Sequence, residues 1–211
     1  MNFIMNNKFI SGIILAGGKS SRLGRNKALE KLGGATLISR VINNISKIAN
    51  EIVIVINHED VKQQLPIPKN AKIAVDLYSN KGSLSGIHSG LNSISGKYGI
   101  VVACDMPFIN CKIFEYLITK TNGHDIVIPK INDRLQPTHA IYSKSCVKEI
   151  EKQLINNDLK ITNFFSNMKV KEIFEKELIS FKDYDLSFFN INTEEDLNIA
   201  KSTIGRYNDP R

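Results

Sequence analysis

The sequence contains no tryptophan, and aromatic residues make up only 8% of its 211 positions. The formal net charge is +7, but the basic residues are spread along the chain and form no stripe. Proteins that bind nucleic acid usually combine clustered cations with aromatic side chains on which bases stack. We therefore expect no nucleic acid partner, and we interpret the excess positive charge as an attraction for small anionic substrates.

Cysteine and long apolar runs are also scarce. The three cysteines, Cys104, Cys111 and Cys146, include no Cys-x-x-Cys pair and have no histidine at the spacing of a zinc site. Their odd number does not suit a disulfide framework, so we predict reduced thiols that pack as small core residues in a cytoplasmic protein. No apolar run approaches the length of a membrane span. We expect no membrane partner.

The chain does contain an alternation of strand-like and helix-like segments, which predicts an α/β fold with a mostly parallel sheet covered by helices. The expected strands are 9–15, 51–56, 72–75, 99–103, 125–129 and 138–142. The expected helices are 36–48, 59–65, 84–95, 145–154 and 162–168, followed by a last helix. That helix opens with Asn192 or Thr193 as N-cap, and Glu195 or Asp196 completes a capping box. We predict one domain over 1–211, with a short extension at 1–8 and a flexible tail at 205–211.

The most informative segment follows the first strand. Residues 15–27 read Leu-Ala-Gly-Gly-Lys-Ser-Ser-Arg-Leu-Gly-Arg-Asn-Lys. Its glycines allow a tight backbone that comes close to a ligand, and its four cations are accompanied by no carboxylate. Exposed N–H groups and positive charge at the carboxyl end of a first strand are suited to holding a polyphosphate. The segment predicts chemistry on nucleotide phosphates.

Two other phosphate motifs do not fit this segment. Gly18-Lys19-Ser20 resembles the end of a P-loop, but the first glycine of that motif would fall on Ile13, inside the expected strand. The dinucleotide-binding pattern of three spaced glycines also fails, because Lys19 and Ser20 occupy the wrong places.

Two carboxylates lie just beyond expected strands, where open α/β sheets bind their ligands. Asp105 follows the strand at 99–103, and a hard oxygen ligand is what Mg²⁺ requires in addition to phosphate oxygens. Asp76 ends the strand at 72–75, six residues before Gly82, and a carboxylate can accept from both N1–H and the exocyclic amine of guanine. Asp105 would otherwise be an ordinary cap or turn residue, and Gly82 would otherwise simply start a helix.

The segment at 15–27 resembles the nucleotidyltransferase signature Leu-Ala-Gly-Gly-x-Ser-x-Arg-(Met or Leu)-Gly-x-x-Lys, and in detail it is similar to the molybdenum cofactor guanylyltransferase family. Cys104-Asp105-Met106-Pro107 matches the family's Cys-Asp-x-Pro segment, and residues 190–197 resemble its terminal Asn-x-Asn-Thr-Pro-Glu-(Glu or Asp)-Leu. The chain departs from the family where Ser83 and Glu194 replace prolines. The resemblance implies a three-layer, Rossmann-like nucleotidyltransferase fold.

The resemblance also implies roles for individual residues. It assigns catalysis to Lys27, Arg22 and Asp105, with Asp105 as the ligand of Mg²⁺. The nucleotide contacts that it implies are Leu15, Ala16, Gly17, Gly18, Lys27, Asp76 and Gly82. The acceptor contacts that it implies are Arg134, Gln136, Asn190 and Asn192, although Arg134 would otherwise be a solvated turn residue.

The implied reaction is transfer of GMP from GTP to the terminal phosphate of molybdopterin, with or without molybdenum, and release of pyrophosphate. Other proteins of molybdenum cofactor biosynthesis and apo-molybdoenzymes would be further partners. Two alternatives remain open at this point. One is a cytidylyltransferase or sugar-phosphate nucleotidyltransferase of the same fold, and the other is a nucleotide-binding carrier without turnover.

Overall fold

The computed structural model describes residues 8–17 and 26–207. Its centre is an eight-stranded sheet with the order β10-β7-β9-β6-β1-β4-β5, and β8 pairs with β7. The strands are β1 (Ile10–Leu15), β4 (Glu51–Ile56), β5 (Lys72–Val75), β6 (Tyr98–Ala103), β7 (Ile126–Ile131), β8 (Arg134–Leu135), β9 (His139–Ser143) and β10 (Val170–Phe174). A separate hairpin consists of β2 (Lys31–Leu32) and β3 (Ala35–Thr36).

The sheet is mostly parallel, as the sequence predicted. β1 runs parallel to β4 and β6, β4 to β5, and β10 to β7. β9 is antiparallel to both of its neighbours, and the short β8 is antiparallel to β7. The buried β-branched runs of β1, β4 and β6 are typical of parallel strands covered on both faces.

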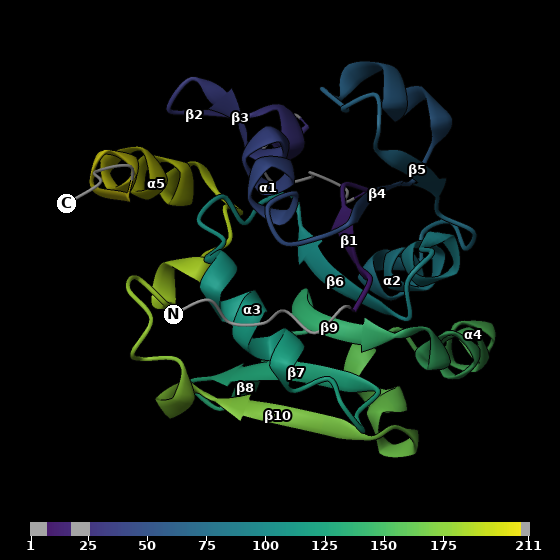
Figure 1. Cartoon of the computed structure of the whole chain (residues 1–211). Helices are drawn as coiled ribbons and strands as arrows, with labels where there is room; N and C mark the ends of the chain where they lie inside the picture. Colours follow the sequence, from purple (N-terminus) through teal and green to yellow (C-terminus); the bar gives the residue numbers. More distant parts are fainter. Residues whose placement is uncertain (1–7, 18–25, 208–211) are drawn as a thin grey trace.

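The α-helices are α1 (Leu37–Ile45), α2 (Gly82–Ser93), α3 (Cys111–Thr119), α4 (Val147–Ile155) and α5 (Glu194–Tyr207). Short 3-10 helices are η1 (Lys27–Leu29), η2 (Glu59–Gln64), η3 (Lys144–Cys146), η4 (Ile161–Asn167), η5 (Glu175–Glu177) and η6 (Asp185–Phe188). In Figure 1, α2 and α4 lie on one side of the sheet and α1 and α3 on the other.

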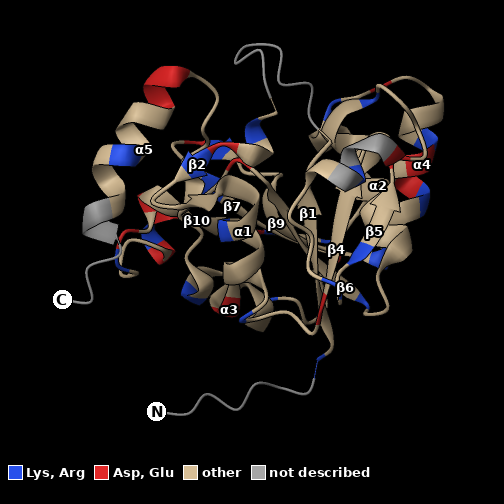
Figure 2. Ribbon diagram, turned by 90° about the horizontal axis from the view of Figure 1, so that it is seen from above, with Lys and Arg blue, Asp and Glu red and all other residues tan. Residues whose placement is uncertain are grey.

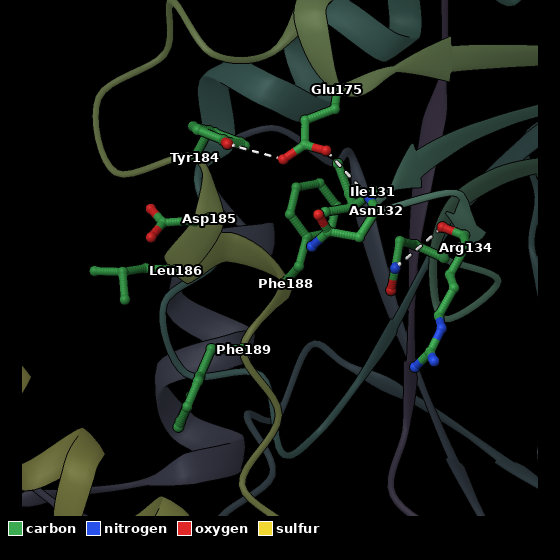
Figure 3. Close-up of a pocket in the computed structure, with 10 residues that line it drawn as sticks. Ile131, Asn132, Arg134, Glu175, Tyr184, Asp185, Leu186, Phe188 and Phe189 are labelled. Carbon is green, nitrogen blue, oxygen red and sulfur yellow. Dashed lines mark hydrogen bonds between the residues drawn. The ribbon is translucent and has the colours of Figure 1, made fainter.

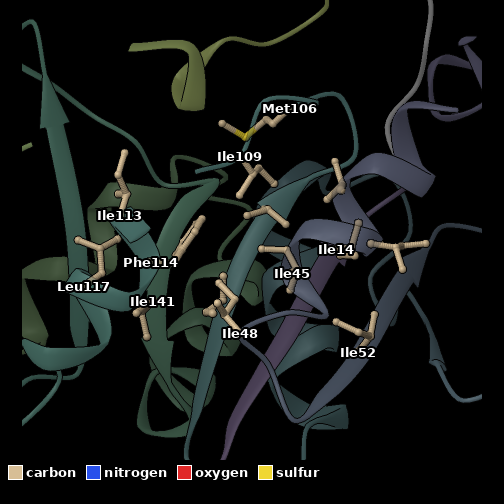
Figure 4. Packing of buried hydrophobic residues seen from close by; sticks show 14 of the residues in the cluster. Ile14, Ile45, Ile48, Ile52, Met106, Ile109, Ile113, Phe114, Leu117 and Ile141 are labelled. Carbon is tan, nitrogen blue, oxygen red and sulfur yellow. The ribbon is translucent and has the colours of Figure 1, made fainter. Parts of the chain in front are cut away.

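The alternation of side chains along the strands produces these layers. Ile14 of β1 packs in a cluster with α1 and α3, whereas its neighbour Ile13 packs in a second cluster with α2 and α4. Figure 4 shows the first cluster, with Ile14, Ile45 and Phe114 among its members. The expectation of a three-layer α/β fold is confirmed.

A third, smaller cluster fastens α5 beside the hairpin β2–β3. Leu197 and Ala200 of α5 pack there with Leu32, Leu37 and Phe108. Because this apolar face continues to Ile204, the helix runs to Tyr207, three residues into the segment that the sequence analysis assigned to a flexible tail. The last four residues of that tail, and the first seven of the expected extension, lie outside the described part of the chain.

Two expected helices are 3-10 helices instead of α-helices. The segment expected at 59–65 is η2, and the one expected at 162–168 is η4. Neither has a side chain that caps its start, and η2 is only six residues long before Pro66. The first turn of an α-helix is unfavourable to form, and only the hydrogen bonds of further residues offset its free energy. Such short segments therefore favour 3-10 geometry. Within 8–17 and 26–207, no helix combines the length and the apolar character that a membrane span requires.

Candidate functional site

Three strands deliver their following loops to the same edge of the sheet. Leu15 of β1 is in register with Val55 of β4 and with Ala103 of β6. The ladder continues for one residue, since Ala16 N donates to Val55 O at 2.8 Å and Cys104 N donates to Leu15 O at 3.1 Å. The residues that follow each strand therefore start side by side at the carboxyl edge, where open α/β sheets bind ligands.

Gly17 starts the glycine-rich loop and lies against Asn57, which follows β4. A Cβ atom on Gly17 would be 2.7 Å from Asn57 Oδ1 and 3.0 Å from Asn57 N. A larger residue at this position would force Asn57 to shift, so the two loops are in direct contact. Asn57 was not predicted from the sequence because it belongs to no motif; its one signal is a polar residue directly after a buried strand. Gly18 and Arg22, both predicted site residues, lie outside the described residues.

Lys27 opens η1 at the far end of that loop. Asn26 caps this short helix by accepting from Ala28 N at 3.1 Å, and the buried Ala28 anchors it. The Lys27 ammonium donates to Asn192 Oδ1 at 2.9 Å and lies 4.0 Å from Asp105 Oδ2. Three residues that the sequence analysis selected from distant segments are thus brought together at one point.

Asp105 is largely buried at this point. Its side chain is 18% exposed, and Oδ1 accepts no hydrogen bond from any described residue. Burial raises the pKa of Asp105, and the positive charge of Lys27 opposes this rise only in part. A buried carboxylate oxygen without a donor is costly, and a bound cation would offset that cost.

The residues around Asp105 fit Mg²⁺ better than they fit a metal that is coordinated by protein side chains alone. No group of three or more His, Cys, Asp or Glu side chains gathers among residues 8–17 and 26–207. Mg²⁺ commonly takes one or two carboxylates and completes its shell with phosphate oxygens and water. Asp105 could supply that carboxylate. The adjacent Cys104 is unsuited to nucleophilic chemistry, because burial raises the pKa of its thiol to about 12.

The start of α5 holds Asn192 in place. Thr193 Oγ1 accepts from Asp196 N at 3.1 Å, and Asp196 Oδ2 accepts from the N–H groups of Asn192 and Thr193, each at 2.8 Å. The expected capping box therefore exists between Thr193 and Asp196. Burial opposes ionisation of Asp196, but these hydrogen bonds and the charge of Lys27 hold its pKa below the ordinary value. Figure 2 shows the acidic residues at this end of α5.

The Asn192 side chain is thus free of the capping role and reaches Lys27. The backbone beside it is tied to the carboxyl edge of the sheet as well, because Ile191 N donates to Asp105 O at 2.9 Å. Further upstream, Phe188 packs against the buried His139, with their ring centroids 4.4 Å apart. Burial lowers the pKa of His139 to about 3, so its ring stays neutral and serves as packing for this segment.

Asp76 and Gly82 lie beyond the neighbouring strand β5. Asp76 N donates to Ile56 O at 2.8 Å, which extends the pairing of β5 with β4 to the same edge. Gly82 opens α2 with φ +67°, a left-handed conformation that favours glycine. Two buried serines of α2, Ser85 and Ser89, donate hydrogen bonds to the Asp76 carboxylate.

The predicted acceptor residues fall in two places. Arg134 and Gln136 line a pocket of about 580 Å³, shown in Figure 3, together with Glu175, Tyr184 and Phe188. Tyr184 Oη donates to Glu175 Oε1 at 2.9 Å, and the Arg134 side chain extends away from that pair. Among the described residues, Asn190 and Asn192 do not line the pocket.

The segment from Phe188 to Asn192 joins these two places. Within this segment, Asn190 Nδ2 donates to Phe188 O at 3.1 Å. Because Gln136 precedes β9, and His139 of that strand is in register with Val102 of β6, the pocket residues also approach the carboxyl edge.

Comparisons with known proteins agree with this geometry. The family model described as "MobA-like NTP transferase domain" matches residues 12–170. A curated relative from Clostridium perfringens (strain 13 / Type A), named "Probable molybdenum cofactor guanylyltransferase", is 44% identical over 189 residues, which cover 88% of this chain and 93% of the relative. A "Molybdenum cofactor guanylyltransferase" from Desulfosudis oleivorans is 36% identical over 200 residues, with 92% and 96% covered.

Among solved structures, the crystal structure of molybdopterin-guanine dinucleotide biosynthesis protein A from Archaeoglobus fulgidus superposes with a TM-score of 0.82 at 30% identity. The match covers 93% of this chain and 99% of that one. The family predicted from the loop at 15–27 is confirmed. The chain belongs to the MobA-like NTP transferase domain family, in its molybdenum cofactor guanylyltransferase branch, and is a nucleotidyltransferase.

Proposed function

We propose that this protein transfers GMP from MgGTP to the terminal phosphate of molybdopterin, metallated or not, and releases pyrophosphate. The observation that carries the proposal is the meeting of Lys27, Asp105 and Asn192 at the carboxyl edge of the sheet. A carrier that only binds nucleotide has no need for a buried carboxylate and a lysine at the same point. The names of the relatives supply the nucleotide and the acceptor.

The chain's own residues would act by positioning and electrostatics. An oxygen of the acceptor phosphate attacks the α-phosphorus in line, a new P–O bond forms, and the bond to the leaving pyrophosphate breaks. Lys27 and Arg22, with the N–H groups of Gly17 and Gly18, would stabilise the charge on the phosphates. No general base is required, because a phosphate monoester is largely ionised at neutral pH, with a second pKa near 6.

Asp105 would hold Mg²⁺ through Oδ1, which accepts no hydrogen bond from the part of the chain that the structure describes. When bound, Mg²⁺ would neutralise phosphate charge and align nucleotide and acceptor oxygens. Asn57 would contact the same nucleotide, because it lies against Gly17 at the start of the loop. Leu15, Ala16 and Gly17 would lie beside the nucleotide, with Asp76 and Gly82 toward the base.

Arg134, Gln136, Asn190 and Asn192 would bind the pterin acceptor. Arg134 can hold a phosphate or a planar ring edge bidentately, and Asn192 lies beside Lys27, where the two substrates would meet. Proteins that supply molybdopterin, and the molybdoenzymes that take up the product, would be the further partners, in the cytoplasm.

The first test removes each charge at the proposed centre. Lys27→Ala and Asp105→Ala should each lower guanylyl transfer by about 10²–10³-fold or more, as loss of one stabilising group typically does. Lys31→Ala, which removes an exposed lysine four residues from Lys27, is the matched control and should leave the rate unchanged. Circular dichroism should show an intact fold in all three. Near-normal transfer by either centre variant would refute the proposed roles.

The nucleotide itself is tested by calorimetry with GTP, CTP, ATP and UTP, each with Mg²⁺. We expect a clear preference for GTP. A preference for CTP would keep the mechanism but exclude guanylyl transfer.

A further inference from the structure

The carboxylate of Asp76 is held from one side. Three donors converge on a single oxygen, Oδ1: the hydroxyl of Ser85, the hydroxyl of Ser89 at 3.4 Å, and Tyr78 N at 3.2 Å. Oδ2 accepts no hydrogen bond from residues 8–17 or 26–207. The two oxygens of this half-buried side chain are therefore not equivalent.

Both serines are buried on the face of α2 that meets Asp76, and Ser89 is fixed in its role as a donor. Ser85 and Ser89 are four residues apart on α2, so both face the loop at Asp76 from the same side of the helix. Their exposed fractions are 0% and 2%. Ser89 Oγ already accepts from Leu77 N at 2.9 Å, which leaves its single proton to point at Asp76.

A carboxylate oxygen has about two lone-pair positions, so three donors saturate Oδ1. Any ligand group that hydrogen-bonds to Asp76 must then use Oδ2. Tyr78 N can only donate, and Ser89 Oγ already accepts from Leu77 N, so an oxygen must occupy the Oδ1 position and the second atom of the side chain is the one turned to the ligand.

We propose that Ser85 and Ser89 are positioning residues that fix which oxygen of Asp76 faces the ligand. Oδ2 is then the single acceptor presented to the N–H donors of the base. The inference rests on the proposed use of GTP and deepens it. Guanine offers N1–H and an exocyclic amine to such an acceptor. Adenine offers a bare nitrogen at N1, which would face the carboxylate unpaired and be rejected.

This fixed orientation of the Asp76 side chain makes a gain-of-function test possible. In Asp76→Asn, the three donors still require an oxygen at the Oδ1 position, so the amide nitrogen must take the place of Oδ2. The site then presents a donor in place of an acceptor. Both bases carry N1–H, but xanthine has a carbonyl oxygen where guanine has its amine. The amide introduced by Asp76→Asn can therefore donate to XTP and not to GTP, so this variant should bind XTP more tightly than GTP. The wild-type protein should bind GTP about tenfold or more tightly than XTP.

A second variant tests the serines directly. Ser85→Ala should weaken GTP binding by about fivefold and leave ATP binding unchanged, because only the contact with the base depends on Asp76. Ser83→Ala is the matched control, since it makes the same substitution at an exposed position in the first turn of α2. Calorimetry with Mg²⁺ and GTP, XTP or ATP measures each dissociation constant.

The outcomes separate this inference from the proposed function. Suppose that the wild-type protein prefers GTP. If Ser85→Ala then keeps the full preference, or if Asp76→Asn does not bind XTP more tightly than GTP, the inference is overturned and guanylyl transfer stands. If Ser85→Ala weakens GTP and ATP equally, the serine has a structural role only, which also overturns it. A wild-type protein without preference for GTP would overturn both proposals.

Discussion

Glu51 collects four hydrogen bonds at the amino end of β4, far along the strand from the proposed site. Its carboxylate accepts from Ser11 Oγ at 2.6 Å, Lys72 Nζ at 2.7 Å, Ser95 N at 2.5 Å and Ser95 Oγ at 3.1 Å. These donors come from β1, β5 and the segment before β6. Burial opposes ionisation of Glu51, but the hydrogen bonds from Lys72, Ser11 and Ser95 prevail and lower its pKa from 4.5 to about 2.

Replacing this carboxylate should cost stability but leave ligand binding intact. We expect Glu51→Gln to lower the free energy of unfolding by about 2 kcal/mol at pH 7, a value discounted for partial screening by solvent. Because the folded pKa lies below the unfolded one, the wild-type advantage is complete above pH 4.5 and shrinks as the pH falls toward 2. Urea unfolding of both proteins at pH 7, 4 and 3 measures the difference in their free energies of unfolding. Glu59→Gln, at an exposed position, is the control.

A difference between wild type and Glu51→Gln that does not change with pH would contradict the ionic origin of this stabilisation. Loss of GTP binding in the variant would contradict the separation of the two edges of the sheet.

Single residues were predictable from sequence where a motif contained them. Lys27, Asp105 and Asn192 each stand in a segment that resembles the family pattern, and the structure brings them together. Asn57 stands in no such segment. Its place depends on the pairing of β1 with β4, a contact between distant parts of the chain that local pattern cannot reveal.

The elements found from sequence are those with strong periodicity. The apolar runs of β1, β4 and β6, and the helical spacing of α1, placed those elements to within a few residues. β10, the hairpin β2–β3 and α3 were not anticipated. β10 reads Val-Lys-Glu-Ile-Phe at the edge of the sheet, without regular alternation, and the hairpin strands have two residues each, so neither gives a distinct pattern.

At the scale of an element, the start of α5 should determine turnover more than nucleotide binding. Asp196→Ala removes the acceptor for the N–H groups of Asn192 and Thr193, so the Asn192 side chain loses its fixed position beside Lys27. We expect guanylyl transfer to fall about tenfold, since small misplacements at a reacting centre are costly, while the dissociation constant for GTP changes less than twofold.

Two further variants give this prediction its controls. Glu195→Ala removes an exposed charge from the same turn and should behave like the wild type. Asp196→Asn keeps an oxygen acceptor and should restore most of the rate. Equal losses in Asp196→Ala and Glu195→Ala would mean that only the charge of the helix start matters.

For the whole molecule, the fold places stabilising contacts and the proposed site at opposite ends of the strands. The clusters on both faces of the sheet bury the apolar side chains of the central strands, and Glu51 joins three segments at the amino edge. The carboxyl edge has the opposite character. It holds the largely buried Asp105 carboxylate, whose Oδ1 accepts no hydrogen bond from the described residues, which costs stability unless a ligand pairs with that oxygen.

Nucleotide and metal together should therefore stabilise the whole fold. A ligand that binds only the native state adds about 2.7 kcal/mol at a concentration one hundred times its dissociation constant, which raises Tm by about 5–10 °C for a chain of this size. GTP with Mg²⁺ should produce this shift in thermal unfolding. GTP with EDTA should produce much less, because phosphates then face the Asp105 carboxylate without a cation between them.

Asp105→Ala separates the two contributions. Without the carboxylate, the shifts produced by GTP with Mg²⁺ and by GTP with EDTA should become nearly equal, and Mg²⁺ alone should shift neither protein. If EDTA left the wild-type shift unchanged, Asp105 would not hold the metal, and its unpaired oxygen would need another partner. Any ligand that binds only the native state raises Tm, so thermal unfolding tests the proposed metal ligand without the molybdopterin acceptor.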